Sequence, residues 1–349
     1  MIRPVLLALA AALSLAAAFA LAGCGEKTEP SAGGARKLEP FTLVLDYVPN
    51  ADHAGIYTAQ ADGEFARAGL QVKIVTPPDP SAPLKLLQAG RADLAISYEP
   101  ELLLARDKGT RLLSVGALVQ TPLTTLMSIG GSGVKTADDL RGKTVGTAGI
   151  PYQTAYLKTI LAKAGVPDSS VKRVDVGFNL VPAMISKRVD ATLGAFWNVE
   201  GVDLAARGKK PTILRMEKLG VPTYDELVLV ARRNSLHQAE SSKIRRFLQA
   251  LSRGTAKAVA DPQAAATALV TANPDLDARR QLAQIRATGP VFEPQGKDQP
   301  YGFQDQAAWH RYGQWMYANH LLDADPAAED ALTNEFLPGQ GVASNTAQP

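Results

Sequence analysis

The sequence predicts a two-lobed α/β protein, and three observations support this prediction. Short apolar segments of strand length alternate with segments whose apolar residues recur at helical spacing. The same alternation begins again after the Gly-rich stretch at residues 128–135. The 349 residues also exceed what one ordinary hydrophobic core needs and suit two lobes of typical domain size.

The first expected lobe begins with a buried strand at 41–45 and a helix that starts at Ala54 and stops at Gly69. The alternation then continues with expected elements, in order a strand at 71–75, a helix at 81–90, a strand at 94–96, a helix at 101–107 and a strand at 112–117. This pattern is typical of a parallel sheet with helices on both faces.

The second expected lobe repeats the pattern. Its expected elements are a strand at 144–145, a helix at 155–164, a strand at 171–176, a helix at 181–187 and a strand at 191–194. The stretches "QAGRADLAIS" from Gln88 and "ISKRVDATLG" from Ile185 both place Arg-x-Asp between a helix and a small-residue strand. This shared junction favours a duplicated architecture. A further strand at 227–231 precedes a mainly helical region from Ser241 through Phe336.

The N-terminus has the pattern of an export signal. Arg3 precedes an apolar run of Ala and Leu that is too short and too rich in small residues to favour a permanent membrane span. The run ends in Leu-Ala-Gly-Cys, which resembles a bacterial lipoprotein lipobox and implies cleavage before Cys24 and acylation of its thiol. The alternative is an uncleaved core helix with an incidental cysteine. We therefore expect a signal peptide at 1–23, a tether at 24–40, one lobe from 41–128 with 225–349, and a second lobe from 129–224.

Composition excludes several function classes. Apolar residues make up 46% and charged residues 20%, which is ordinary for a globular protein. The net charge of +3 is spread without basic runs, so nothing favours nucleic-acid binding. Because Cys24 is the only cysteine, neither an intrachain disulfide nor a cysteine-based metal site can form. The common P-loop, zinc-protease and serine-hydrolase motifs do not occur, and we expect no metal and no cofactor.

Polar and aromatic residues gather where the expected strands end, which is where open α/β sheets bind ligands. Four stretches carry them: "LDYVPNADHAGIYTAQ", "DPSAPLKLLQAGRADLAISYEPELLLARDKG", "VGFNLVPAMISKRVDATLGAFWNVEG" and "GVPTYDELVLVA". Together they resemble the binders of thiamin pyrimidine precursors, the NMT1/THI5-like group within the sulfonate-, nitrate- and taurine-binding superfamily of ABC importers. The resemblance covers nearly all of 41–322. It implies a type II periplasmic-binding fold, with two lobes joined by two crossovers that close on a flat heterocycle.

The resemblance and the strand-end positions together nominate ten ligand-binding residues: Tyr47, Asn50, His53, Tyr98, Asn179, Phe196, Trp197, Asn198, Glu200 and Tyr224. Tyr47, Tyr98 and Trp197 are expected to supply flat faces, the asparagines the polar edge, and Glu200 an acceptor for an amino group. Tyr47 and Phe196 depart from the Trp and Tyr that are usual in the subgroup.

Several of these residues also have structural interpretations. Tyr47 and Tyr98 suit the caps of a core at strand ends, and Asn50 suits a turn. His53 and Asn179 suit helix caps, and Glu200 suits the first turn of a helix, where carboxylates are favourable. Tyr224 suits a wall or a hinge.

Two other functions remain as alternatives. Fungal pyrimidine synthases share the fold and much of the pattern, but their pyridoxal-phosphate lysine corresponds here to Ser97 and their reactive histidine to Glu101. Their cysteine-rich stretch corresponds to "LGVPTYDELVLV", so we expect no enzymatic activity. The second alternative is a binder of another heterocycle, such as a riboflavin-type precursor, or of a sulfonate or nitrate. Anion sites usually carry Arg, Lys or a Gly/Ser-rich helix start, which the expected cleft lacks.

The expected function is therefore that of a solute-binding lipoprotein, a monomer anchored through Cys24 on the outer side of a bacterial membrane. It would bind formylaminopyrimidine or hydroxymethylpyrimidine, close by hinge motion, and deliver the ligand to an ABC permease driven by a separate ATPase.

Overall fold

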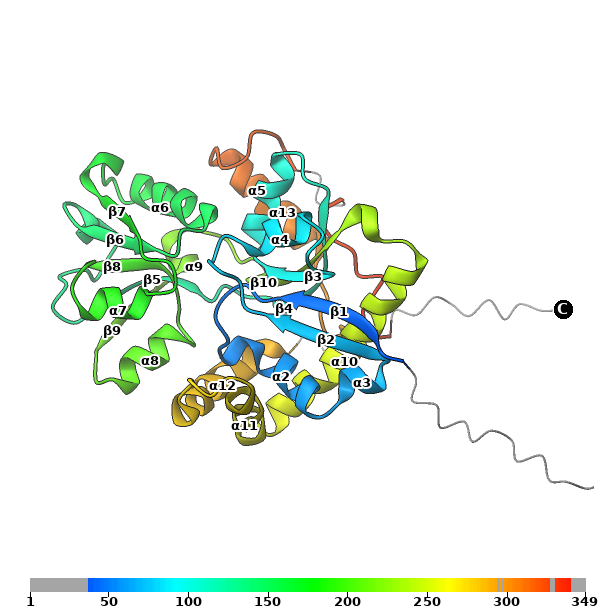
Figure 1. The fold of residues 1–349 in the computed structure, drawn as a ribbon. Coiled ribbons are helices and arrows are strands. Elements are labelled where there is room, and N and C mark those ends of the chain that lie inside the picture. The colour runs from blue at the N-terminus through cyan, green and yellow to red at the C-terminus, as the bar shows by residue number, and fades with distance from the viewer. Residues whose placement is uncertain (1–36, 294–295, 297, 327–329, 340–349) are drawn as a thin grey trace, which may run out of the picture. The chain divides into compact units, whose positions relative to one another are not determined.

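The computed structural model describes residues 37–293, 296, 298–326 and 330–339. The expected signal peptide, the lipidated Cys24 and most of the tether lie outside the described residues. The described residues from Leu38 onward form one compact unit. Two five-stranded sheets organise this unit (Figure 1).

The first sheet has the order β2-β1-β3-β10-β4. Its strands are β1 (Glu39–Val44), β2 (Leu70–Val75), β3 (Leu94–Ser97), β4 (Leu112–Val119) and β10 (Leu227–Arg232). The helices that follow its strands in the first part of the chain are α2 (Ala54–Ala61), α3 (Glu64–Arg67), α4 (Pro83–Gln88) and α5 (Glu99–Asp107). The expected single helix from Ala54 is divided at Gly63, whose backbone is left-handed at φ 71°.

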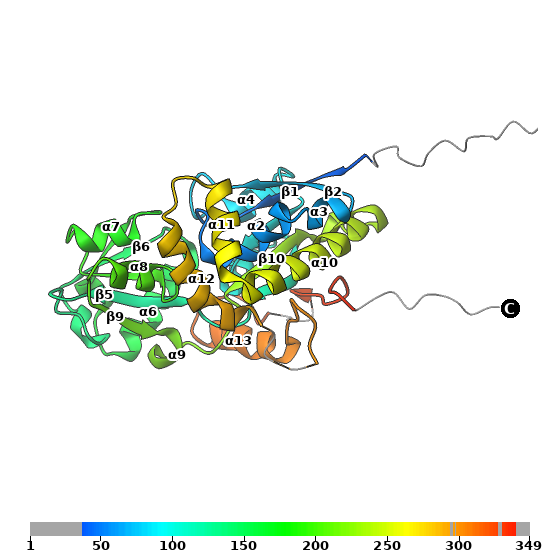
Figure 2. The same cartoon turned by 90° about the horizontal axis from the view of Figure 1, so that it is seen from below.

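The second sheet has the order β7-β6-β8-β5-β9. Its strands are β5 (Thr124–Ile129), β6 (Thr144–Thr147), β7 (Lys172–Asp175), β8 (Ala191–Phe196) and β9 (Pro211–Arg215). Its helices are α6 (Pro151–Lys163), α7 (Leu180–Ile185), α8 (Glu200–Ala206) and α9 (Met216–Leu219). In Figure 2, α7 and α8 lie on one face of this sheet and α6 and α9 on the other.

The expectation of parallel sheets was wrong for one strand in each sheet. β10 runs antiparallel to β3 and β4, and β5 runs antiparallel to β8 and β9. Each of these strands is the first that the chain forms after it crosses from one sheet to the other. A strand that enters from the neighbouring lobe has no βαβ crossover to set its direction, so the helix–strand alternation does not predict it.

Because β5 belongs to the second sheet, the first crossing lies earlier in the chain than expected. β4 ends at Val119 in the first sheet and β5 begins at Thr124 in the second, so the chain crosses before the expected boundary at residue 128. The strands β5 and β9 were missing from the sequence prediction. The second crossing lies between α9 and β10, where the boundary at 224–225 was expected.

The repeated Arg-x-Asp junction occupies equivalent places in the two sheets. Asp93 accepts a hydrogen bond from the backbone N–H of Thr42 at 2.6 Å, and Asp190 accepts one from Thr144 at 2.8 Å. Each aspartate thereby joins the start of β3 or β8 to the parallel strand beside it. The matching sheet orders and these matching bonds agree with a duplicated architecture.

The C-terminal part of the chain is helical and packs on the first sheet. Its helices are α10 (Gln238–Ala260), α11 (Pro262–Ala272), α12 (Ala278–Phe292) and α13 (Gln306–Ala318). In Figure 1, α2, α3 and α10 lie on one side of the first sheet, and α4, α5 and α13 lie on the other. The helical region ends at Ala318 rather than at the expected Phe336.

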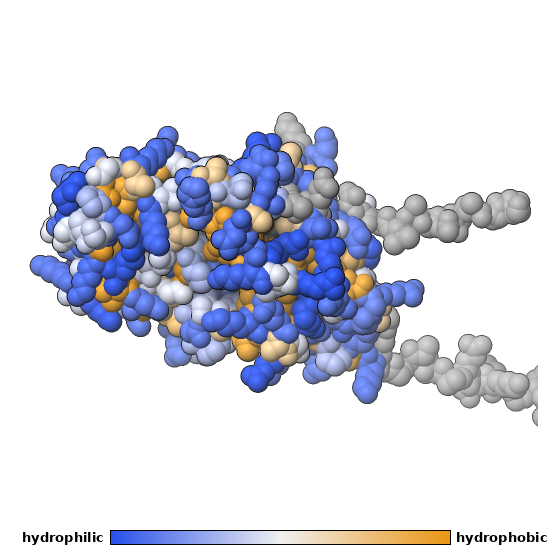
Figure 3. Space-filling model, turned by 90° about the horizontal axis from the view of Figure 1, so that it is seen from above, coloured by the Kyte–Doolittle hydropathy of each residue, from blue (hydrophilic) through white to orange (hydrophobic). Residues whose placement is uncertain are grey.

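The apolar residues that define the alternation are mainly inside the fold. All four residues of β3 and all six of β8 are buried, as are all eight of β4. Seen from above in Figure 3, hydrophilic side chains cover most of the face, and the apolar side chains appear in small groups between them. Among the described residues, no helix has the length and apolar character needed to cross a membrane.

Candidate functional site

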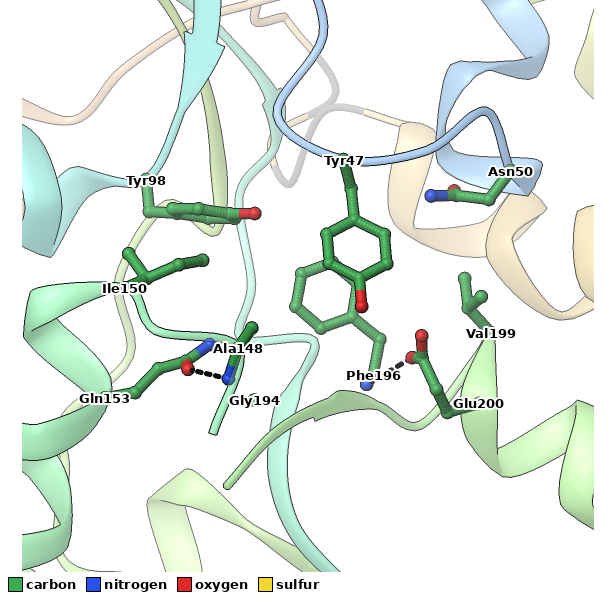
Figure 4. A pocket seen from close by; sticks show the side chains of 10 residues that line it. All are labelled: Tyr47, Asn50, Tyr98, Ala148, Ile150, Gln153, Gly194, Phe196, Val199 and Glu200. Atoms are coloured by element: carbon green, nitrogen blue, oxygen red, sulfur yellow. Dashed lines mark hydrogen bonds between the residues drawn. The ribbon is translucent and has the colours of Figure 1, made fainter. Parts of the chain in front are cut away.

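A narrow pocket lies where strands of both sheets end. Its lining residues come from the end of β8 and from the loops and helix starts that follow β1, β3, β6 and β8. They are Tyr47, Asn50, Tyr98, Ala148, Ile150, Gln153, Gly194, Phe196, Val199 and Glu200 (Figure 4). The carboxyl end of strands is the usual ligand site of open α/β sheets. The cavity between these residues has a volume of only about 10 Å³. A ring-sized ligand therefore requires the walls to move apart.

The wall from the first sheet is organised around Asp46. This buried carboxylate accepts a hydrogen bond of 2.8 Å from the Tyr98 hydroxyl, and its second oxygen lies 2.8 Å from His53 Nε2. The Nδ1 atom of His53 accepts the backbone N–H of Asn50 at 3.2 Å, so the ring proton lies on Nε2 and is donated to Asp46. His53 is fully buried behind the wall and is absent from the pocket lining. Its structural interpretation as a cap agrees with this geometry.

Asn50 begins the short 3₁₀ helix Ala51–His53 and also lines the pocket. Its Oδ1 accepts the backbone N–H of Asp52 at 2.8 Å, and its Nδ2 donates to the Val48 carbonyl at 3.0 Å. The Asn50 side chain therefore both stabilises the turn and lines the pocket.

The wall from the second sheet contains Glu200, the first residue of α8. The backbone N–H of Phe196 donates to Glu200 Oε2 at 2.7 Å, which bends the side chain back over the end of β8. Burial raises the pKa of Glu200 to about 7, although the bond from Phe196 opposes this rise. Glu200 is therefore the lining residue whose protonation changes near neutral pH.

Aromatic rings form much of the remaining lining. The rings of Tyr98 and Phe196 lie edge to face with centroids 6.4 Å apart, and Tyr98 also contacts the ring of Tyr152 at 5.3 Å. Tyr47 meets Phe178 edge to face at 4.8 Å. Burial raises the pKa values of Tyr47 and Tyr98 well above their ordinary value, so both hydroxyls stay protonated.

Gln153 and Gly194 complete the floor. Gln153 Oε1 accepts the backbone N–H of Ala148 at 2.8 Å, which ties the loop after β6 to the start of α6. Gly194 has φ 118°, and a Cβ at this position would lie 2.2 Å from Gln153 Nε2. Only glycine gives the amide this room. The segments that hold these residues were predicted as strand ends, but Ala148, Ile150, Gln153, Gly194 and Val199 were not singled out.

Trp197 was expected to be an aromatic face of the pocket, and the structure places it elsewhere. Its Nε1–H donates to the Pro122 carbonyl at 3.3 Å, and the Arg215 guanidinium lies 4.5 Å from its ring centroid. Consecutive side chains at the end of a strand point to opposite faces. Because Phe196 faces the pocket, Trp197 faces away and packs beside the first crossing.

Three other expected ligand residues also lie outside the lining. Asn179 is exposed at the start of α7 and makes no capping hydrogen bond with its side chain. Asn198 is fully buried and donates to Asp52 and Thr288. Tyr224 is buried at the second crossing, where its hydroxyl donates to Glu226 at 2.9 Å.

Glu226 joins the two crossings and was missed by the sequence prediction. Its carboxylate accepts the backbone N–H groups of Leu123 and Thr124 at 2.7 and 2.8 Å and the Thr124 hydroxyl at 2.9 Å. Burial raises its pKa to about 7. A charged residue at the start of a buried strand gave the only hint of this role.

This chain is similar in sequence to a known protein family and to characterised relatives. The family model described as "NMT1/THI5 like" matches residues 50–265. The formylaminopyrimidine-binding protein of Halalkalibacterium halodurans is 33% identical, with 92% of this chain and 96% of the relative covered. A 4-amino-5-hydroxymethyl-2-methylpyrimidine phosphate synthase of Legionella pneumophila is 26% identical, with 85% and 92% covered.

Solved structures agree on the fold. The alkanesulfonate-binding protein SsuA of Xanthomonas axonopodis pv. citri, bound to MOPS, superposes with a TM-score of 0.66 at 19% identity. The match covers 85% of this chain and 99% of that protein. At this identity the likeness shows a shared fold of two α/β lobes and leaves the ligand to be argued from the pocket.

Proposed function

This chain belongs to the NMT1/THI5-like family, and from this premise we propose that it captures a thiamin-related aminopyrimidine for an ABC importer. It is a solute-binding protein with the two-lobed fold of periplasmic binding proteins, and its place is outside the cytoplasmic membrane. Formylaminopyrimidine is the first candidate ligand, because the relative with 33% identity is named for binding it.

The observation that carries this proposal is the composition of the pocket. Aromatic and aliphatic side chains dominate the lining, while Asn50, Gln153, Glu200 and the hydroxyls of Tyr47 and Tyr98 provide the side-chain polar groups. A planar heterocycle offers two apolar faces and a polar rim, which match this arrangement. None of the ten lining residues is Lys or Arg, which disfavours a sulfonate or nitrate as cargo.

Glu200 suits the edge of an aminopyrimidine. That edge places an amino donor beside a ring-nitrogen acceptor, and a carboxyl group with one proton matches both. The proton can lie on Glu200 or on the ring nitrogen, and in the second case the pair is charge-assisted. A carboxyl whose pKa is about 7 carries this proton in a large fraction of molecules at neutral pH.

We propose that the protein performs no chemistry on its ligand. Ser97, which stands where the related synthases have their pyridoxal-phosphate lysine, is buried at the end of β3 and cannot form a Schiff base. Addition of pyridoxal phosphate should therefore produce no imine absorbance that borohydride can trap. A trapped adduct on a lysine near the pocket would favour the synthase function.

Membrane attachment and delivery are further parts of the proposal. Acylation of Cys24 would hold the protein beside its permease, and the residues between Cys24 and β1 would act as the tether. Metabolic labelling with a fatty acid should mark the wild-type chain in a bacterial host and fail to mark Cys24→Ser.

Isothermal titration tests the ligand directly. The full chain is titrated with formylaminopyrimidine, hydroxymethylpyrimidine, thiamin, riboflavin and taurine. We expect the aminopyrimidines to bind most tightly and taurine to give no heat. Exclusive binding of riboflavin or taurine would overturn the proposed cargo, and the absence of heat from all five compounds would overturn the proposed class of ligand.

A further inference from the structure

A buried carboxyl–amide contact joins the two walls of the pocket. Asn198 follows β8 of the second sheet, and Asp52 lies in the short helix after β1 of the first. Asn198 Nδ2 donates to Asp52 Oδ1 at 2.6 Å and to Thr288 Oγ1 on α12 at 2.8 Å. Asp52 is 2% exposed, and Asn198 and Thr288 are fully buried.

The orientation of the Asn198 amide follows from its neighbours. The Thr288 hydroxyl donates its proton to the Gln284 carbonyl at 2.9 Å, so its oxygen must accept from Asn198. The amide nitrogen therefore faces Thr288 and Asp52, and both of its protons are used. The amide oxygen is left to face a different partner.

Two oxygen atoms at this contact have no hydrogen-bond donor among the described residues. They are Asp52 Oδ2 and Asn198 Oδ1, and both atoms are shielded from solvent. A carboxylate oxygen and an amide oxygen that are buried without donors destabilise the folded state, because each loses its hydrogen bonds to water on folding. One proton on Asp52 would satisfy both oxygens at once.

We propose that Asp52 is held in the protonated form and donates through Oδ2 to Asn198 Oδ1, which makes a two-point carboxyl–amide pair that positions the two walls of the pocket. Asn198 directly precedes the lining residues Val199 and Glu200, and Asp52 lies two residues after the lining residue Asn50. Gln284 of α12 supports the same corner, since its Nε2 donates to the Val199 carbonyl at 2.9 Å.

The charges around Asp52 favour the protonated form. The ionisable groups that raise its pKa are Asp46 after β1, Glu200 at the start of α8 and Glu226 just before β10, all of them acids. Burial raises the pKa of Asp52 well above its ordinary value, and Asp46 adds to this rise, while the bond from Asn198 opposes it. His53, the next residue, directs its ring proton to Asp46.

The helices packed against Asp52 provide no compensating cation. Within α12, Arg280 pairs with Asp203 at 2.8 Å, and Arg279 and Arg286 are exposed. The helices α2 and α11 contain no Lys, Arg, Asp or Glu. Asp52 therefore has no described positive partner that would keep it ionised.

The pair has a pH dependence with a definite sign. A carboxyl whose pKa is raised on folding contributes stability that is complete below its unfolded pKa, about 3.9, and that is lost as pH rises through the folded value. Once Asp52 is ionised, its Oδ2 no longer donates to Asn198 Oδ1, and the contact between the walls weakens.

The test compares the full chain with Asp52→Asn and Asp52→Ala in urea unfolding at several pH values between 5 and 9. Asparagine reproduces both hydrogen bonds without a titrating proton. We expect Asp52→Asn to keep its stability across this range better than the wild type, and Asp52→Ala to raise the unfolding constant about tenfold or more at pH 5. The exposed Asp79→Asn should follow the wild-type profile.

Two results would overturn the proposal. One is an Asp52→Asn chain as unstable at pH 5 as Asp52→Ala, which would show that a carboxylate is needed. The other is a free energy of unfolding that changes with pH by the same amount in the wild type and in Asp52→Asn. If Asp52→Asn does not fold, the carboxyl ¹³C shift of Asp52 in the unmodified protein decides the matter. A ¹³C shift typical of a protonated carboxyl at pH 6 supports the pair, and a shift typical of an ionised carboxylate overturns it. No ligand is needed, so failure here is separate from failure of the proposed function.

Discussion

The Tyr98 hydroxyl donates a hydrogen bond of 2.8 Å to Asp46 Oδ2, so the ring that forms one wall of the pocket is held by a buried carboxylate behind it. Together with His53 on the other oxygen, this bond connects the ends of β1 and β3. Contacts within the protein thus hold this wall in place, which lowers the ordering cost of binding.

Tyr98→Phe should separate the role of the hydroxyl from that of the ring. The change keeps the aromatic face but removes one donor from Asp46, so we expect a loss of about 1–2 kcal/mol in the free energy of unfolding. Affinity for an aminopyrimidine, measured by calorimetry, should change little. Tyr98→Ala, the matched control, removes the ring and should weaken binding about tenfold or more. Loss of binding in Tyr98→Phe without loss of stability would instead assign the hydroxyl to the ligand.

Glu200 should make ligand affinity depend on pH. In the proposed complex the aminopyrimidine and Glu200 share one proton, and the free carboxyl already holds it below its pKa of about 7. Above that pH the complex must take up a proton, so affinity should fall, approaching tenfold per pH unit. Calorimetry between pH 6 and 9 measures this slope.

Glu200→Gln provides the control for that slope. Glutamine keeps an oxygen for the Phe196 N–H and a donor for a ring nitrogen, but it does not titrate. Its affinity should be nearly independent of pH in the same range. If wild-type affinity rises with pH, the ionised carboxylate alone is the acceptor and the shared proton is excluded.

Gly194→Ala should damage the pocket floor. Its φ of 118° is unfavourable for alanine, and the new Cβ would meet Gln153 Nε2 at 2.2 Å. We expect a loss of more than about 2 kcal/mol in stability and weaker ligand binding. Gly131→Ala, at φ 93° in open space, tests backbone strain alone and should cost about 1–2 kcal/mol. Equal losses in the two variants would contradict the role of the Gln153 contact.

Lys187→Gly should stabilise the protein. Lys187 adopts φ 60° at the place in the second lobe where the first lobe has Gly90 at φ 71°, since both precede the Arg-x-Asp junction. A non-glycine residue in this region costs about 1–2 kcal/mol, and Lys187 is exposed. Urea unfolding should show that the free energy of unfolding rises by up to about 1 kcal/mol. The gain is smaller than the relieved strain because glycine gives the unfolded chain more conformational entropy. Gly90→Lys should cause the opposite change, and a loss of stability in Lys187→Gly would contradict the argument.

The sequence predicted which residues lie near the site better than it predicted which of their side chains face the pocket. Tyr47, Asn50, Tyr98, Phe196 and Glu200 were all nominated and all line the pocket. Strand ends are local features, so the stretches that carry these residues could be found from periodicity alone. The wrong expectation for Trp197 arose because two adjacent aromatic residues are equivalent until the strand they end is paired and one face becomes buried.

Asn198 illustrates the same limit for polar residues. Its amide suits a ligand edge, but its partners Asp52 and Thr288 lie 146 and 90 positions away in the sequence. Glu226 likewise gains its partners only when Leu123 and Thr124 are brought beside it from the other crossing. No local spacing records such distant partners.

The sequence by itself determined the alternation of strands and helices, the repeated Arg-x-Asp junction and the loops that carry polar residues, because these depend on near neighbours along the chain. The tertiary structure alone decided that β5 and β10 run antiparallel, that Phe196 rather than Trp197 faces the pocket, and that Asp52 meets Asn198. These outcomes depend on which distant segments pair and bury one another, and that choice is made by packing of the whole fold.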